Sequence, residues 1–104
     1  MQGPICVVVR LWIREGAMHE FEAYERNAAR IMRRHGGTIE RAIRVTQRNA
    51  SDDPFEIHIV TFPGEKELAD YRADPEREPF SAQREASILK TEAVVGIDLP
   101  AYTT

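Results

Sequence analysis

The chain has 104 residues, a length that allows one domain and leaves little room for a second. Its residues are 42% apolar and 30% charged, which is too apolar for a disordered chain and too polar for a membrane protein. With 14 basic and 17 acidic residues the formal net charge is −3, which argues against nucleic acid as a partner.

The N-terminal segment predicts a strand. Residues 5–14 are rich in β-branched side chains, which crowd a helix but suit a pleated surface. The apolar run in this segment is broken at Arg10 and follows no basic stretch, so we expect neither a signal peptide nor a membrane span. The single cysteine, Cys6, excludes an intrachain disulfide and fits the reducing cytoplasm.

The most clearly marked helix begins near residue 18. Its apolar stripe recurs at steps of three and four residues and consists of Met18, Phe21, Tyr24, Ala28 and Ile31. Acidic side chains lie early in this segment and basic ones late, an order that suits the helix dipole. Gly36 and Gly37 follow, and glycine supplies the left-handed backbone that ends a helix at low cost.

A β-hairpin is predicted next. Residues 38–48 alternate between apolar and polar side chains, which indicates a half-buried strand. Residues 49–54 are polar and form a turn, and residues 55–62 form a third strand that pairs antiparallel with the second. Pro63 and Gly64 end this strand.

The second helical region is less regular. Residues 65–73 predict a short helix with Leu68 and Tyr71 facing inward. Asp74 and Pro75 fit an N-cap followed by a first-turn proline, and Pro79 must then distort or restart the helix. Helical spacing resumes as far as residue 89. A last strand then spans about residues 92–99, and residues 100–104 form a tail.

The element order β-α-β-β-α-β predicts one ferredoxin-like α+β domain over residues 1–104, in which a four-stranded antiparallel sheet carries both helices on one face. Strand alternation divides the strand residues between two faces. The set expected under the helices is Ile5, Val7, Val9, Leu11, Ile13, Phe55, Ile57, Ile59, Val95, Ile97 and Leu99. The set expected on the opposite face is Cys6, Val8, Arg10, Trp12, Arg14, Glu40, Arg44, Thr46, Glu56, His58, Val60, Phe62, Glu92, Val94, Gly96 and Asp98.

The second set predicts a covered sheet face. It is too charged for a dry core, yet its large apolar members are too many to face water as one patch. In a chain this small the available cover is another copy of itself, packed sheet against sheet around a two-fold axis. The charged side chains would then lie in a partly enclosed cavity or pair across the interface. We therefore expect a homodimer.

Three stretches carry a family resemblance. They are residues 34–38, the run from Ile57 to Gly64, and the spacing of Tyr71 to Asp74 and Pro75. On these stretches residues 5–99 resemble the dimeric α+β barrel superfamily, which includes the antibiotic-biosynthesis monooxygenases. Within it the chain most resembles a family of small bacterial proteins of unknown function.

The resemblance implies a dimeric barrel but no single reaction. The superfamily contains cofactor-free oxygenases, haem degraders, isomerases and proteins with no known reaction, so the fold does not settle the function. The haem degraders use an Asn, Trp and His arrangement that finds no match here, because Trp12 and His58 are strand residues with no accompanying Asn.

His58 is the candidate acid or base, because an imidazole titrates near neutrality and this one is expected beside Glu56. The alternative is a histidine that is hydrogen-bonded within a dimer interface. Arg10 and Arg44 are candidates to bind a carboxylate or an enolate oxygen, or else to pair with Glu56 and other acids of neighbouring strands.

Two aromatic side chains are candidates for ligand contact. Trp12 and Phe62 either stack on a flat aromatic ligand or pack in the interface, where aromatic residues are enriched. Tyr24 and Tyr71 lie on apolar helix faces and could line the mouth of a cavity. Glu56 and His58 share a face, but no second histidine is well placed, so we expect no metal. We expect no other cofactor either.

The sequence leaves three functions open. The first is a small, cofactor-independent monooxygenase or isomerase whose cavity holds an aromatic or oxo-acid ligand, with His58 as acid or base and Arg10 or Arg44 as oxyanion partner. The second is a protein of the same shape that binds a small organic anion without converting it. The third is a purely structural dimer with a filled interface.

Overall fold

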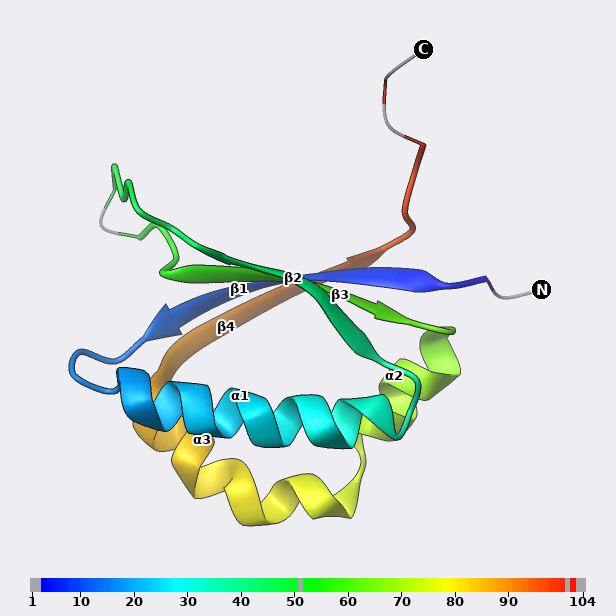
Figure 1. Cartoon of the computed structure of the whole chain (residues 1–104), viewed down its shortest axis with the longest axis horizontal. Coiled ribbons are helices and arrows are strands. Elements are labelled where there is room, and N and C mark those ends of the chain that lie inside the picture. Colours follow the sequence, from blue (N-terminus) through cyan, green and yellow to red (C-terminus); the bar gives the residue numbers. More distant parts are fainter. Residues whose placement is uncertain (1–2, 51, 101, 103–104) are drawn as a thin grey trace.

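The computed structural model describes residues 3–50, 52–100 and 102. A four-stranded sheet carries all of the described helices on one face, as Figure 1 shows. The elements in chain order are β1 (Ile5–Ile13), α1 (Met18–Arg33), β2 (Thr38–Arg44), β3 (Glu56–Phe62), α2 (Glu65–Arg72), the short 3-10 helix η1 (Pro75–Phe80), α3 (Ser81–Ser87) and β4 (Ile88–Gly96). The sheet order is β2-β3-β1-β4 with antiparallel neighbours, which confirms the predicted ferredoxin-like fold.

Helix α1 follows the predicted apolar stripe and ends at the predicted glycines. Phe21, Tyr24, Ala28 and Ile31 are buried against the sheet. At its end the Gly37 N–H donates to the carbonyl of Met32 and the Gly36 N–H donates to the carbonyl of Arg33. This is a Schellman motif, and Gly36 has the left-handed φ of 76° that the motif requires.

The second crossover consists of three short helices because of its prolines. The Asp74 side chain accepts from the N–H of Glu76, as expected for an N-cap, with Pro75 in the first turn. Pro79 lies inside η1, and a new helix begins at Ser81. The predicted distortion is therefore confirmed. In contrast, Ile88 was expected in the helix but begins β4, where it pairs with Ile13.

Strand β4 begins and ends earlier in the chain than the sequence pattern predicts. The strand was expected over about residues 92–99, but it ends at Gly96. Ile97 and Leu99, expected under the helices, lie beyond the strand and are exposed. The predicted tail, residues 100–104, falls mainly outside the described residues, which include only 100 and 102 of it.

The predicted facing of β3 was wrong. The residues of β3 that lie under the helices are Glu56, His58, Val60 and Phe62, each 8% exposed or less. Ile57 and Ile59 lie on the opposite face of the sheet. Each of the four is paired in register with a helix-side residue of β1, for example Val60 with Val7. The apolar pattern does not show which side of β3 faces the helices, because large apolar side chains occur at both odd and even positions of the strand.

A β-bulge in β2 changes the side of the sheet that its later residues face. The pairing of β2 with β3 shifts between Ile39 and Arg41, so residues after the bulge exchange faces relative to those before it. Ile43 lies opposite Ile57, away from the helices, and Arg44 lies opposite Glu56, on the helix side. The expectation that Arg44 belongs to the face away from the helices was therefore wrong.

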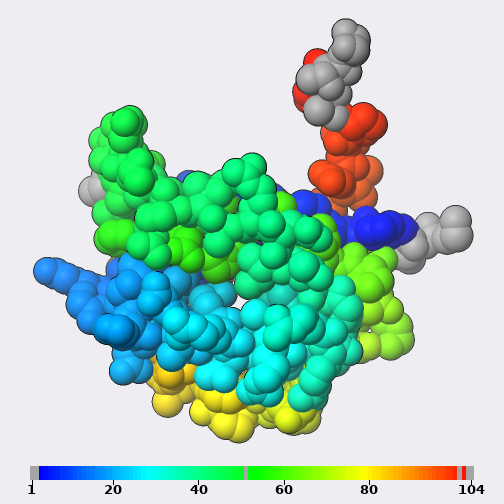
Figure 2. All heavy atoms as spheres, viewed as in Figure 1, coloured from blue at the N-terminus to red at the C-terminus, as the bar shows by residue number. Residues whose placement is uncertain are grey.

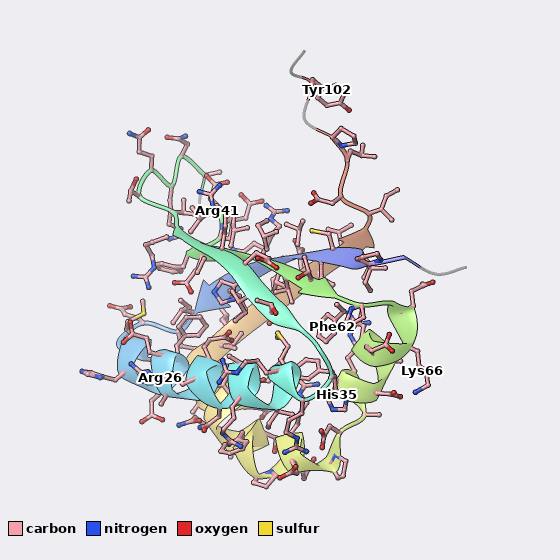
Figure 3. All side chains as sticks on the ribbon, turned by 45° about the vertical axis from the view of Figure 1, so that its right-hand side comes forward. Arg26, His35, Arg41, Phe62, Lys66 and Tyr102 are labelled. Carbon is pink, nitrogen blue, oxygen red and sulfur yellow. The ribbon has the colours of Figure 1, made fainter. Side chains whose placement is uncertain are left out.

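We call the sheet surface away from the helices the open face. Its residues include Cys6, Val8, Arg10, Trp12, Arg41, Ile43, Ile57, Ile59, Thr61, Glu92 and Val94. Figure 3 shows Arg41 on this side of the sheet and Phe62 between the sheet and the helices. The segment that joins β2 to β3 and the segment after β4 both project on this side, beyond the compact body (Figure 2). None of the described helices is long and apolar enough to cross a membrane.

Two of the predicted ligand-binding residues, Arg10 and Trp12, lie on the open face. The Arg10 guanidinium pairs with Glu92 at 3.4 Å and lies 5.5 Å from the Trp12 ring centroid. The Lys90 ammonium lies 4.6 Å from the same ring, and the Trp12 indole N–H donates to the carbonyl of Asp52 at 3.0 Å. Trp12 is therefore buried by its own chain, although it belongs to the open face.

We expect Gly37→Ala to destabilise the fold. A Cβ at this position would collide with the Met32 side chain and would lie 2.5 Å from the Phe62 ring. Overpacking of this kind costs about 1–3 kcal/mol. Urea denaturation followed by circular dichroism measures the free energy of unfolding. Gly3→Ala is the matched control, because nothing lies within 4 Å of a Cβ at Gly3. Equal stability of the two variants would contradict the tight packing of α1 on β3.

Candidate functional site

A cavity of about 520 Å³ lies between the helix side of the sheet and the four helices. Its apolar wall comes from the sheet and from α1 and α2, and includes Val7, Val9, Met32, Val60, Phe62 and Leu68. We call it the inner cavity. The sequence pattern predicts a ligand cavity between the sheets of two copies, but this cavity lies inside a single copy, on the other side of the sheet.

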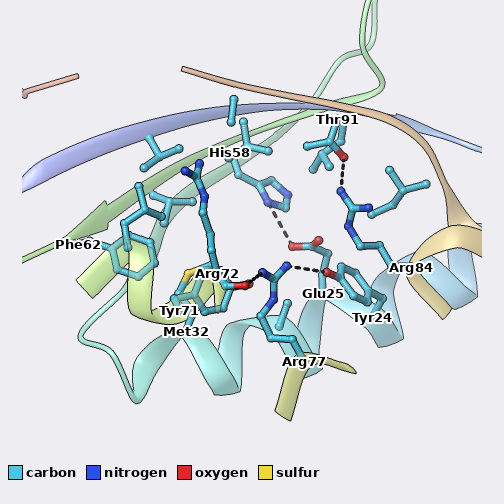
Figure 4. Close-up of a pocket in the computed structure, with 18 residues that line it drawn as sticks. Tyr24, Glu25, Met32, His58, Phe62, Tyr71, Arg72, Arg77, Arg84 and Thr91 are labelled. Carbon is cyan, nitrogen blue, oxygen red and sulfur yellow. Dashed lines mark hydrogen bonds and ion pairs between the residues drawn. The ribbon is translucent and has the colours of Figure 1, made fainter. Parts of the chain in front are cut away.

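Polar side chains enter the inner cavity from several elements, as Figure 4 shows. They are Tyr24 and Glu25 of α1, His58 of β3, Tyr71 and Arg72 of α2, Arg77 of η1, Arg84 of α3 and Thr91 of β4. An apolar pocket with a few converging polar groups is the usual form of a small-molecule site. The volume and the lining both fit this description.

A row of charged groups leads from the protein surface to the inner cavity. Arg44 donates to Glu56 Oε1 through Nε at 2.9 Å and Nη2 at 2.7 Å. The other Glu56 oxygen, Oε2, lies 2.6 Å from His58 Nε2. On the far side of the ring, His58 Nδ1 lies 3.4 Å from Glu25 Oε1. His58 is thus held between two carboxyl groups, one behind it and one at the cavity.

The hydrogen bonds assign the histidine tautomer. Glu56 is an ion-paired carboxylate, and a carboxylate can accept hydrogen bonds but cannot donate them. His58 Nε2 must therefore carry the proton of that 2.6 Å bond. In the neutral ring this leaves Nδ1 with a free lone pair directed toward Glu25 and the cavity. A base whose orientation is fixed by a third group is the arrangement that general-base catalysis requires.

Glu25 holds its proton more strongly than an exposed glutamate. Burial raises the pKa of Glu25, and the charge of Glu56 adds to this effect, while His58 and the nearby arginines oppose it. The net direction is upward because the loss of hydration is the largest effect. Glu25 is therefore suited to exchange a proton with His58 Nδ1 or with a bound ligand.

Tyr71 supplies a neutral hydroxyl at the opposite side of the cavity. Its ring packs against Phe62 at 5.6 Å between centroids, and the Arg77 guanidinium lies 4.5 Å from the ring centroid. Burial raises the pKa of Tyr71 to about 12, so its O–H remains a donor at neutral pH. Tyr24 accepts a 3.5 Å hydrogen bond from Arg77 Nη2. Both tyrosines line the inner cavity.

The structure brings part of the predicted site together. His58 and Phe62 line the inner cavity, Glu56 lies directly behind His58, and Arg44 closes the row at the surface. Arg10 and Trp12 lie on the open face and do not join them. His58 and Phe62 reach the cavity because of the facing of β3 that the sequence analysis did not predict.

Sequence reasoning missed Glu25 and the three cavity arginines, Arg72, Arg77 and Arg84. Glu25 could have been found, because it follows Phe21 by four residues and precedes Ala28 by three, on the buried side of α1. A charged residue inside an apolar stripe is a signal of a special role. The arginines gave no such signal, because they lie in short helices that are mostly exposed.

Within the described part of the chain, no group of three or more His, Cys, Asp or Glu side chains is arranged to hold a metal ion. The single cysteine, Cys6, is a free thiol on the open face and does not line the inner cavity. The polar groups that line the cavity are carboxyl, imidazole, phenol and guanidinium groups and the Thr91 hydroxyl.

Solved structures with the same fold include proteins of known and unknown activity. A protein of unknown function from Rhodopseudomonas palustris is 16% identical, covers 96% of this chain and 85% of its own, and gives a TM-score of 0.80. SnoaB, a cofactor-independent oxygenase from Streptomyces nogalater, is 19% identical, with 98% and 99% covered and a TM-score of 0.72. A dabb family protein with a ferredoxin-like fold from Mesorhizobium loti is 17% identical, with 95% and 100% covered and a TM-score of 0.69.

These likenesses confirm the predicted resemblance at the level of the fold. No protein-family profile matches the sequence, and no curated protein is a significant match to it. The structural neighbours share the whole length of the chain but less than a fifth of its residues. One of them is a cofactor-independent oxygenase and another has no known function, so the shared fold does not fix an activity.

We expect Glu25→Gln to change the pH dependence of stability. Because the pKa of Glu25 is raised in the folded state, its charged form opposes folding. The wild-type chain should therefore lose stability relative to the variant as pH rises through the folded pKa, and the two should match at acid pH, where Glu25 is protonated in both states. Urea denaturation between about pH 4 and pH 8 measures the difference. A variant that is less stable at neutral pH would contradict this sign.

Proposed function

We propose that this protein is a homodimeric acid–base enzyme that acts on a small organic molecule, aromatic or oxo-acid, held in the inner cavity without a cofactor. The observation that carries the proposal is His58, which is fixed by Glu56 on one side and directs its free Nδ1 toward Glu25 and the cavity on the other. Removal of a proton from the ligand is the step that this geometry performs.

His58 acts as the general base. Its Nδ1 takes a proton from an acidic C–H or O–H of the ligand, and Glu56 stabilises the resulting imidazolium. Arg44 pairs with Glu56 at the surface end of the row. Glu25, which holds a proton more readily than an exposed carboxyl, accepts that proton from His58 Nδ1 and returns it to the ligand at another atom or to the medium, which restores both groups.

The rest of the cavity stabilises the anion that proton removal creates. The neutral Tyr71 hydroxyl and the cavity arginines are donors for a developing enolate or phenolate oxygen. Such an anion is electron-rich, so it either reacts with molecular oxygen or takes a proton back at another carbon. The first outcome is a cofactor-independent oxygenation, and the second is an isomerisation.

One structural neighbour favours the oxygenase form of the proposal. SnoaB, with a TM-score of 0.72 to this chain, is described as a cofactor-independent oxygenase. The alternative function is binding of the same kind of ligand without turnover. The inner cavity supports that alternative as well, and the buried histidine between two carboxyl groups favours catalysis over it.

The open face supports the homodimer within the proposal. Its centre includes two apolar pairs in register, Val8 with Ile59 and Ile43 with Ile57. Charged side chains flank these pairs, among them Arg10, which pairs with Glu92. Apolar contacts with polar neighbours are the usual composition of a protein interface. The cytoplasm is the compartment we propose, since the Cys6 thiol is free.

His58→Asn should abolish proton removal. Deuterium exchange into a panel of 2-oxo acids, followed by NMR, and oxygen uptake with a panel of polycyclic phenols measure the two forms of the reaction. We expect the rate with any accepted ligand to fall by about 100-fold or more, a typical contribution of a general base. His19→Asn is the control, because His19 is exposed on α1. Activity that survives in His58→Asn would overturn the assigned role.

Ile59→Asp should dissociate the homodimer, because it places a charge at the apolar centre of the open face. Light scattering on a sizing column should give twice the chain mass of 11.9 kDa for the wild type and the mass of one chain for the variant. Ala82→Asp, on the exposed surface of α3, is the control and should stay dimeric. A monomeric wild type would refute the homodimer.

A further inference from the structure

Three arginines, Arg72, Arg77 and Arg84, separate the inner cavity from a second cavity. The second, which we call the outer cavity, has a volume of about 300 Å³ and lies against η1. All three arginines line both cavities, and so does Tyr24. They come from α2, η1 and α3, so three separate helices each contribute an arginine that lines both cavities.

These arginines lack the carboxylate partners that other arginines of this chain have. Arg77 donates to the Tyr24 hydroxyl and to the carbonyl of Arg72, and Arg84 donates to the Thr91 hydroxyl at 3.2 Å. All of these acceptors are neutral. None of the three guanidinium groups forms a salt bridge with a described residue, whereas Arg10, Arg34 and Arg44 all do.

The nearby carboxyl groups have other partners or face solvent. In the inner cavity Glu25 is the carboxyl group among the described lining residues, and it lies 3.4 Å from His58. In the outer cavity Asp74 already interacts with Arg34, with His35 and with the N–H of Glu76, and Glu78 is exposed. The three guanidinium groups therefore keep donors that no carboxylate of the described residues uses.

An organic anion is the ligand chemistry that fits such a boundary. Guanidinium groups present fixed pairs of donors that match the two oxygens of a carboxylate. Arg77 and Arg84 are partly buried, which strengthens such an interaction, and Arg72 is exposed. Beyond the arginines the inner cavity is walled by apolar side chains such as Val60 and Phe62. In the view of Figure 4, Arg72 and Arg84 extend from the helices toward the sheet on either side of His58.

We propose that the ligand is an amphipathic carboxylic acid, whose carboxylate is bound by Arg72, Arg77 and Arg84 while its apolar or aromatic body fills the inner cavity beside His58. This inference rests on the proposed function, because it names the substrate class of the same site. It also assigns specificity to residues that the acid–base row does not contain. Arg72 and Arg84 select the acid, and His58 acts on it.

A competition experiment tests the substrate class. The neutral dye phenylnaphthylamine, which fluoresces in apolar surroundings, reports occupancy of the inner cavity in the full-length protein. Naphthoate and naphthamide then compete for it, since they have the same ring and nearly the same shape and differ in charge. We expect naphthoate to displace the dye at about tenfold lower concentration, in line with the strength of charge-assisted hydrogen bonds.

Matched variants locate the effect. Arg72→Gln and Arg84→Gln should each reduce the preference for naphthoate over naphthamide severalfold, a ratio that corrects for any change in dye binding itself. Arg26→Gln removes the same charge from the exposed side of α1, where Figure 3 shows it directed away from the sheet, and should keep the preference. Melting temperatures near that of the wild type would show that the variants are folded.

The outcomes separate the two proposals. If the dye binds but naphthoate and naphthamide compete equally, or if the preference survives both arginine substitutions, the substrate class is overturned and the cavity remains a binding site. If neither the dye nor naphthoate binds, with calorimetry as the direct measurement, the proposed function fails together with the inference.

Discussion

The carboxylate of Glu56 on the buried face of β3 is the constraint around which the site is arranged. A buried carboxylate is costly unless it is paired and hydrogen-bonded. Arg44 pairs with one of its oxygens and His58 with the other, so neither oxygen is left without a partner. The bulge in β2 is what turns Arg44 to the helix side, where this pairing is possible. The strand facing, the bulge and the histidine orientation thus form one arrangement.

This arrangement gives the two faces of the sheet different tasks. The charged side chains of β3 lie on the helix side, where His58 lines the inner cavity and Glu56 lies behind it. The open face has Ile59 beside Val8 and Ile57 beside Ile43, where the sequence pattern predicts Glu56, His58, Val60 and Phe62. The sheet therefore separates a reactive interior from the surface that we propose for association. The same strand residues could not serve both purposes if they were shifted by one position.

The second crossover contributes through its irregularity. Asp74 and Pro75 end one helix and begin the next, and Pro79 breaks the path again before α3. Three short helices with different directions replace one long helix, and each brings one arginine to the cavity boundary. The prolines that made this region hard to predict are thus the reason that its cationic side chains converge.

The sequence by itself determined the order of the elements, the ends of α1 at its glycines and the ferredoxin-like fold, because hydrophobic spacing and glycine or proline signals act over short stretches. It also singled out His58, but on the wrong side of the sheet. Only the tertiary structure decided the facing of β3 and β2, since Glu56 becomes tolerable in the core through Arg44, a residue twelve positions away. It alone brought Glu25 to His58 from another element. A local sequence pattern predicts where strands and helices form. The pairing of buried charges depends on contacts that form only when distant segments pack together.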